Sequence, residues 1–214
     1  MGTRGAFGVI IGEQEKIGYN QFDSYPDGYG IENLSWLRAV DHTTVRRLAT
    51  AAKVVSNDRR PSKEEQEFLA LYADTNVSEQ SLEDWYCLLH KTHGSIDLML
   101  QSGYIEDCSS FPLDSLFCEW AYIVDLDEDV FEVYQGFVKG RPTLGRWAGR
   151  PTPEEDAANF QKHLDWCEKE GREPWFPETA EYGAVGLIAR WRLDALPSDE
   201  EFLAQTRSRE EAEV

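Results

Sequence analysis

Hydroxyl, amide and carboxyl side chains gather in the first 30 residues, where their spacing permits amide-bond hydrolysis. Thr3 stands just before the apolar run GAFGVII (5–11), and Asn20 and Asp23 stand at the end of a second run, EKIGYNQF (15–22). If the two runs pair as an antiparallel hairpin, these ends lie side by side. A threonine can act as a nucleophile when the α-amine of its own chain takes the proton, and an α-amine pKa of about 8 permits this at neutral pH. We therefore predict Thr3 as a nucleophile, with Asn20 and Asp23 orienting the amine or holding an oxyanion.

The stretch GYNQFDSYPDGYG (18–30) surrounds these groups with further hydrogen-bonding side chains. Tyr19 and Tyr25 are predicted to line a pocket, so that the stretch forms its lip. A polar turn between two elements is the alternative interpretation, because Gly, Pro, Asn and Asp are also the residues that turns prefer.

A glycine-rich loop, GRPTLGRWAGRP (140–151), concentrates positive charge in an otherwise acidic chain. Arg141, Arg146 and Arg150 could bind a phosphate or carboxylate, with Trp147 as an aromatic wall. We predict this loop as the second wall of a site for a small anionic ligand. The alternative is a solvated loop whose arginines balance nearby carboxylates.

Metal and cofactor motifs are weak or missing. His90 and His93, in LLHKTHG, have the i, i+3 spacing of two zinc ligands, but no third ligand motif accompanies them. A cationic histidine that the helix dipole favours at a helix C-terminus explains the pair as well. The stretch DLDEDVFEVYQG opens like a calcium loop, yet Val130 and Gly136 occupy the positions that need Gly and Glu. The sequence has no nucleotide-binding or zinc-protease signature. We therefore predict no metal and no cofactor.

The net charge of −19 limits the partners that the chain can bind. Binding of nucleic acid or anionic membranes requires clustered Lys and Arg, so neither is predicted. The charge suits a basic protein partner or mimicry of nucleic acid, or it serves solubility alone. No run approaches the roughly 18 apolar residues of a transmembrane helix, and the first apolar run is too short for a secretory signal. The four cysteines form no CxxC pair and are interpreted as reduced. A cytoplasmic location is expected.

The elements that would position these residues predict an α+β fold with a mainly antiparallel sheet and a helical middle of about 31–102. A hairpin over 5–22 is followed by helices over 31–40 and 42–55. Capping boxes at Ser62 and Ser198 begin two further helices. The remaining predictions are a hairpin in 119–137, a helix from Thr152 to Gly171 and a strand in 184–194. We expect one domain over 1–206 and a charged, frayed tail over 207–214.

Two short motifs resemble those of Ntn hydrolases, enzymes with an N-terminal nucleophile. The pair Gly2–Thr3 resembles the junction at which proteasome-type β subunits cleave themselves, and YNQFDSYP resembles the Asn-x-Asp segment of choloylglycine hydrolases. YIVDLDEDVFEVY is similar to a late hairpin of that fold. The resemblance implies an αββα sandwich of two sheets and an amide hydrolase that uses Thr3.

The whole sequence also resembles an uncharacterised family of phage and actinobacterial proteins that begin MGTRG and carry YNxFDSYP and FCEWAYIVDLD-like segments. A phage origin implies an acidic accessory or host-interaction role. The acidity, the absence of a catalytic triad or metal motif, and the seven Trp and nine Tyr favour a non-catalytic protein that binds a host protein or a small anionic ligand. Because aromatic side chains dominate interface hot spots, Tyr25, Trp147 and Trp175 are the candidates for exposed anchors. The alternative is that all three belong to the core, which is the commoner place for Trp. The sequence leaves open whether the chain is an enzyme, and it predicts no oligomeric state.

Overall fold

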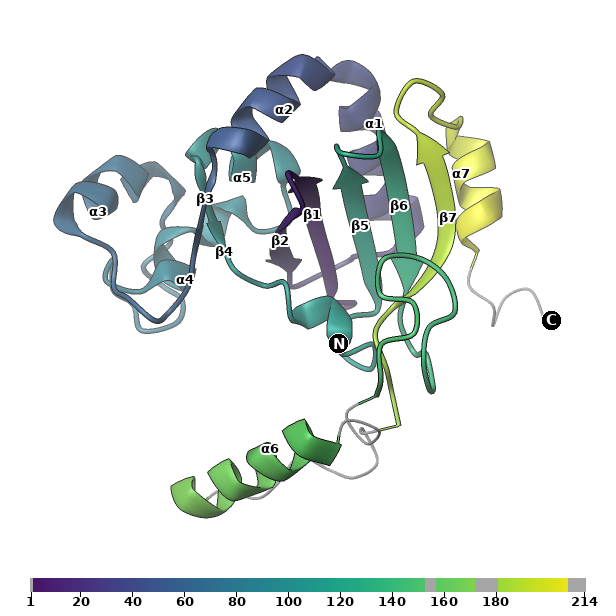
Figure 1. The fold of residues 1–214 in the computed structure, drawn as a ribbon. Coiled ribbons are helices and arrows are strands. Elements are labelled where there is room, and N and C mark those ends of the chain that lie inside the picture. The colour runs from purple at the N-terminus through teal and green to yellow at the C-terminus, as the bar shows by residue number, and fades with distance from the viewer. Residues whose placement is uncertain (1, 153–156, 172–180, 208–214) are drawn as a thin grey trace.

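The computed structural model describes the whole chain except residues 1, 153–156, 172–180 and 208–214 (Figure 1). Its centre is a five-stranded sheet in the order β2-β1-β5-β6-β7. The strands are β1 (Gly5–Ile11), β2 (Gln14–Asn20), β5 (Trp120–Asp125), β6 (Val130–Gln135) and β7 (Gly186–Arg192). Two short strands, β3 (Lys53–Val55) and β4 (Tyr104–Glu106), pair in parallel as a second, smaller sheet.

The predicted α+β class and the mainly antiparallel pairing are confirmed. β1 with β2, β5 with β6, and β6 with β7 all pair antiparallel, and both predicted hairpins form. β1 and β5 pair in parallel, which the sequence did not reveal. The long helical segment between the two hairpins makes this possible, because parallel neighbours need a long crossover connection.

The helices lie mostly against one face of the sheet. Figure 1 shows α1, α2 and α5 gathered beside the sheet, α7 next to β7, and α6 standing apart. The bounds are α1 (Ile31–Ala39), α2 (His42–Ala51), α3 (Lys63–Leu69), α4 (Trp85–Leu88), α5 (Ile96–Ser102), α6 (Ala157–Glu170) and α7 (Asp199–Thr206). Among the described residues, no helix has the length and apolar character needed to cross a membrane.

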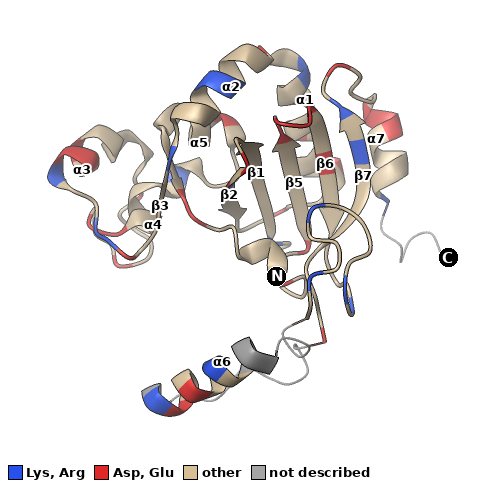
Figure 2. Ribbon diagram, viewed as in Figure 1, with Lys and Arg blue, Asp and Glu red and all other residues tan. Residues whose placement is uncertain are grey.

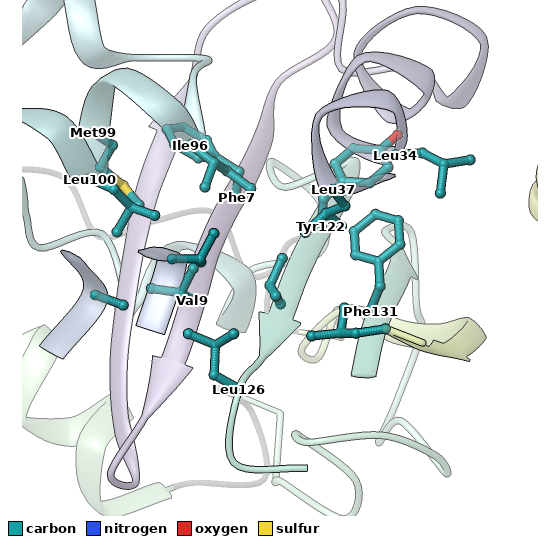
Figure 3. Close-up of a cluster of buried hydrophobic side chains, with 14 of the residues drawn as sticks. Phe7, Val9, Leu34, Leu37, Ile96, Met99, Leu100, Tyr122, Leu126 and Phe131 are labelled. Carbon is teal, nitrogen blue, oxygen red and sulfur yellow. The ribbon is translucent and has the colours of Figure 1, made fainter. Parts of the chain in front are cut away.

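The largest hydrophobic cluster lies between the helices and the sheet. Strand side chains such as Phe7, Tyr122 and Phe131 meet Leu34 and Leu37 of α1 and the apolar face of α5 (Figure 3). Burying each such side chain contributes about 1.5–3 kcal/mol. The packing of α1 in this cluster therefore places the segment before α1 on the same face of the sheet.

The opposite face of the sheet is covered by loops. Ala6, Ile10, Ala121 and Ile123 form a second cluster with Tyr134 and with Trp147 of the 140–150 loop. An αββα sandwich would instead stack a second sheet on this face. The short β3–β4 sheet lies beside the edge strand β2, where Cys108 N donates to Ile17 O at 3.0 Å. The described residues thus do not meet the more specific expectation of an Ntn-like αββα sandwich.

The helix predicted over 42–55 is shorter than expected. α2 ends at Ala51, and Lys53–Val55 forms β3. Lys16, which is buried in β2, donates from Nζ to the carbonyls of Ala49 at 2.5 Å and Ala52 at 2.7 Å. Because Lys16 satisfies two carbonyls at the helix C-terminus, the chain can leave the helix there.

The other predicted caps are confirmed where the structure describes them. Both capping boxes form, with Ser62 paired to Glu65 and Ser198 paired to Glu201. Gly171 follows α6 with a φ of 62°, as expected of a glycine that closes a helix. The start of the helix predicted from Thr152 lies outside the described residues, as does the predicted tail beyond residue 207.

Candidate functional site

A hydrogen-bonded framework holds the 18–30 segment where β2 turns towards α1. Asn20 Nδ2 donates to the carbonyl of Phe22 at 2.7 Å and to Ser24 Oγ at 2.8 Å. Ser24 is fully buried, its amide donates to the carbonyl of Thr3 at 3.1 Å, and its own carbonyl accepts from the Tyr122 hydroxyl at 2.8 Å. Ser24 therefore ties the turn both to the start of β1 and to the middle of the sheet.

The predicted catalytic residues lie at the same end of the first hairpin. Gly5 is the partner of Asn20 in the β1–β2 register, and Thr3 lies beside Ser24. Thr3 is only 3% exposed, and the Asn20 amide nitrogen is used to hold the turn. Asp23 is exposed and has a left-handed backbone with a φ of 52°. The structure brings Thr3 and Asn20 together, but in an arrangement that serves the local backbone.

The outer side of the turn displays aromatic rings between carboxylates. Phe22 is 63% exposed and Tyr25 is 51% exposed, while Asp23 and Asp27 are exposed beside them in the chain. We call residues 21–28 the aromatic turn. The ring of Phe22 lies against Gly2, where a β-carbon would collide with it. The aromatic turn therefore presents apolar surface and negative charge together.

The ring of Tyr19 packs against residues outside the aromatic turn. Its ring packs edge-on against Phe111 at 5.0 Å and against His93 at 6.3 Å between ring centroids. Its hydroxyl donates to Gln21 Oε1 at 2.6 Å, and burial raises the pKa of this phenol. Tyr19 thus links the 18–30 segment to His93, one of the two histidines with the spacing of zinc ligands. In the described part of the chain, no group of three His, Cys, Asp or Glu side chains could hold a metal ion.

Arg146, in the arginine loop of residues 140–151, pairs with buried carboxylates. Arg146 forms an ion pair with Asp125 and lies 3.9 Å from Glu132. The side chains of Asp125 and Glu132 are each only 6% exposed. Tyr134 joins the network, because its hydroxyl donates to Glu132 Oε2 at 2.7 Å and accepts from the Arg146 amide at 3.1 Å. Arg146 therefore balances negative charge inside the protein.

The arginine loop and the aromatic turn lie on opposite faces of the sheet. Tyr29, next to the aromatic turn, packs edge-on against Tyr122 at 5.5 Å, whereas Trp147 packs against Tyr134 at 4.7 Å. Val133 is the cross-strand partner of Tyr122, so Tyr134, the next residue, points to the other face. The structure therefore does not bring the loop that carries Arg141, Arg146 and Arg150 to the predicted lip.

The structure describes two of the three residues expected as exposed anchors, and these two differ in burial. Tyr25 is exposed as expected, whereas Trp147 is completely buried, so its prediction as an exposed anchor is wrong. Trp175 lies outside the described residues. The sequence analysis missed Phe22, the most exposed aromatic ring of the turn. Its signal was a large apolar side chain inside a polar turn, where no hydrophobic period requires it.

Comparison of the chain with protein-family models, with curated proteins and with solved structures finds no match. The geometry of the site therefore carries the functional argument.

Proposed function

We propose that this protein is a non-catalytic binding protein whose aromatic turn docks onto a basic segment of a partner protein. The observation that carries the proposal is the exposure of Phe22 and Tyr25 on a turn that the Asn20 side chain holds through Phe22 O and Ser24 Oγ. Aromatic side chains exposed on a fixed backbone are typical anchors of protein interfaces. The accessory role implied by the phage-type resemblance agrees with this function.

The chemistry of the aromatic turn favours a cationic partner. Asp23 and Asp27 would pair with Lys or Arg, and the rings of Phe22 and Tyr25 can hold a cation over their faces, a contact worth about 0.5–2 kcal/mol. The net charge of −19 would steer a basic partner towards the protein and repel an acidic one. A small anion would meet the carboxylates without the arginines that were expected to offset them.

The anchoring of Ser24 supports docking rather than folding on binding. Its amide, carbonyl and hydroxyl each have a partner in Thr3, Tyr122 and Asn20. A turn that is already ordered loses little conformational entropy when a partner binds.

An amide hydrolase with Thr3 as nucleophile is the second candidate. The observation that favours it is the placement of Thr3 and Asn20 at one end of the hairpin, beside Ser24. Because Thr3 is buried, a substrate could reach it only after the aromatic turn moved away. Intact mass distinguishes the two functions: a mature chain that begins at Thr3, with activity lost on Thr3→Ala, would support the hydrolase.

The docking function is tested with a synthetic peptide rich in Lys and Arg, titrated into the protein by calorimetry. We expect the double variant Phe22→Ala/Tyr25→Ala to weaken binding about tenfold or more, since interface hot spots are worth about 2 kcal/mol. Phe68→Ala is the matched control, because Phe68 on α3 is 65% exposed, as Phe22 is 63%. Equal affinity for the double variant and the control would contradict the proposal.

A further inference from the structure

A polar cavity of about 530 Å³ opens among the residues after β3, the turns before α4, and β4. This volume lies within the range of small-molecule sites, about 300–1,000 Å³. All of the residues that line the cavity are polar. They include two arginines, Arg59 and Arg60, and four carboxylates, Glu79, Glu83, Asp84 and Glu106. Figure 2 shows both basic and acidic residues around α3 and α4. The name "acidic cavity" is used below for this feature.

The two arginines of the acidic cavity are already paired. Arg59 forms a bidentate pair with Glu65, at 2.7 and 2.8 Å, and lies 4.9 Å above the ring centre of Trp85. Arg60 pairs with Glu83 at 2.6 Å. Glu65 is outside the lining, so the pairs leave the charges of Glu79, Asp84 and Glu106 uncompensated by arginine within the cavity. The cavity is therefore negative.

The inner wall combines an aromatic ring with a nearly buried carboxylate. The Tyr86 ring packs against His93 at 4.9 Å and His90 at 5.2 Å between ring centroids. Glu106 lines the cavity, is only 14% exposed, and has its Oε2 atom 3.4 Å from His93 Nε2. Glu106 Oε2 and both imidazole Nδ1 atoms are buried and have no hydrogen-bond partner among the described residues. Buried polar atoms without a hydrogen-bond partner are uncommon in folded proteins.

An organic cation matches this wall better than an anion or an apolar molecule does. An ammonium or guanidinium group can donate charged hydrogen bonds to carboxylates, which are about twice as strong as neutral ones. The face of an aromatic ring such as Tyr86 also attracts a cation. Burial lowers the pKa of His90, with a smaller contribution from His93, so neutral pH does not favour a positive charge at His90.

We infer that the acidic cavity binds a small organic cation that carries an ammonium or guanidinium group, with Glu106 and Tyr86 as its principal contacts. This site is independent of the aromatic turn, because none of its lining residues belongs to residues 21–28.

The inference is tested with agmatine, which carries one guanidinium and one ammonium group. The imidazole NMR signals of His90 and His93 report on the inner wall, and that of His42 on α2 serves as an internal reference. We expect saturable shifts of His90 and His93 with agmatine, no shift of His42, and no shift with the dicarboxylate glutarate. Failure of His90 and His93 to respond at millimolar agmatine, or an equal response to glutarate, would overturn the inference.

A pair of charge-matched variants separates this site from general attraction by an acidic protein. Glu106→Gln should weaken agmatine binding at least tenfold, whereas Glu67→Gln, an exposed carboxylate on α3 outside the lining, should change it less than twofold. Equal losses would mean attraction by net charge alone and would refute the site. If Glu106→Gln does not fold, Tyr86→Leu provides the same comparison. The Phe22→Ala/Tyr25→Ala variant should bind agmatine normally, so the docking function and the cation site can fail separately.

Discussion

The hydroxyl of Tyr122 donates a 2.8 Å hydrogen bond to the carbonyl of Ser24, which lies 98 residues earlier in the chain. Tyr122 belongs to the central strand β5 and is completely buried, as is Ser24. The bond joins the rigid centre of the sheet to the base of the aromatic turn. It gives the proposed docking surface a fixed position relative to the core.

Removal of this hydroxyl should destabilise the protein. Tyr122→Phe keeps the ring and leaves a buried carbonyl without its donor, which costs about 1–3 kcal/mol. Urea unfolding followed by circular dichroism measures the change. Tyr25→Phe is the control, because loss of an exposed hydroxyl should change stability by less than about 0.5 kcal/mol. A Tyr122→Phe protein as stable as the control would show that the bond contributes nothing.

Arg146 should matter for stability rather than for binding an anion. Arg146→Ala leaves Asp125 buried without its cation, whereas Glu132 keeps Arg190 at 3.3 Å. Breaking such a buried pair costs about 3–5 kcal/mol. Arg150→Ala, an exposed arginine of the same loop, should cost less than about 0.5 kcal/mol. Thermal unfolding of the two variants makes the comparison.

Removal of the Asp125 charge should restore part of the stability that is lost in Arg146→Ala. Asp125→Asn in the Arg146→Ala background eliminates the carboxylate that has lost its cation, so the double variant should be more stable than Arg146→Ala alone. If it is less stable by the full cost of both substitutions, the two residues act independently and the charge-balancing role of Arg146 is refuted.

The sequence predicted the elements that depend on residues close together in the chain. Ser62 and Glu65 form a capping box within four residues, and Asp125 Oδ1 accepts from the amides of Asp127 and Glu128 in the hairpin turn that follows it. The sequence could not reveal the end of α2, because Lys16, which donates to the carbonyls at that end, lies 33 and 36 residues from them. Local patterns carry no information about such partners.

The candidate site also combines features that the sequence could predict with features that it could not. The nearness of Thr3 and Asn20 follows from hairpin pairing alone, and the structure shows it. The separation of Tyr29 from Trp147 depends on the register between β5 and β6, together with the segments that fold back onto each face. Alternation along one strand gives two faces, but it does not say which distant loop covers each.

The two capping boxes offer a comparison between a peripheral and a core helix. Ser62→Ala and Ser198→Ala each remove the side-chain acceptor for one helix-end amide, a loss of about 1 kcal/mol. α7 buries Phe202 in the main cluster, so the loss at Ser198 should appear in global unfolding. α3 packs outside that cluster, so the loss at Ser62 should appear as faster amide exchange in α3. Equal global effects would contradict this division.

His90 should make stability depend on pH. Burial lowers its pKa in the folded protein, His93 lowers it further, and Asp74 and Glu106 oppose the shift. The unfolded chain therefore binds a proton at His90 more readily, with a pKa of about 6.5. Stability from this group is complete above that pH and falls as the pH drops towards the folded pKa. Tyr86 packs on the same ring, but its phenol pKa is raised by burial, so it stays neutral in this window.

Two measurements check this dependence together. The NMR titration of the His90 imidazole should have a midpoint below about 6.5, the value of an unperturbed histidine. His90→Phe keeps an aromatic ring against Tyr86 and removes the titration, so the loss of stability below about pH 6.5 should become smaller than in the parent protein. A His90 midpoint above that value would reverse the sign of the effect.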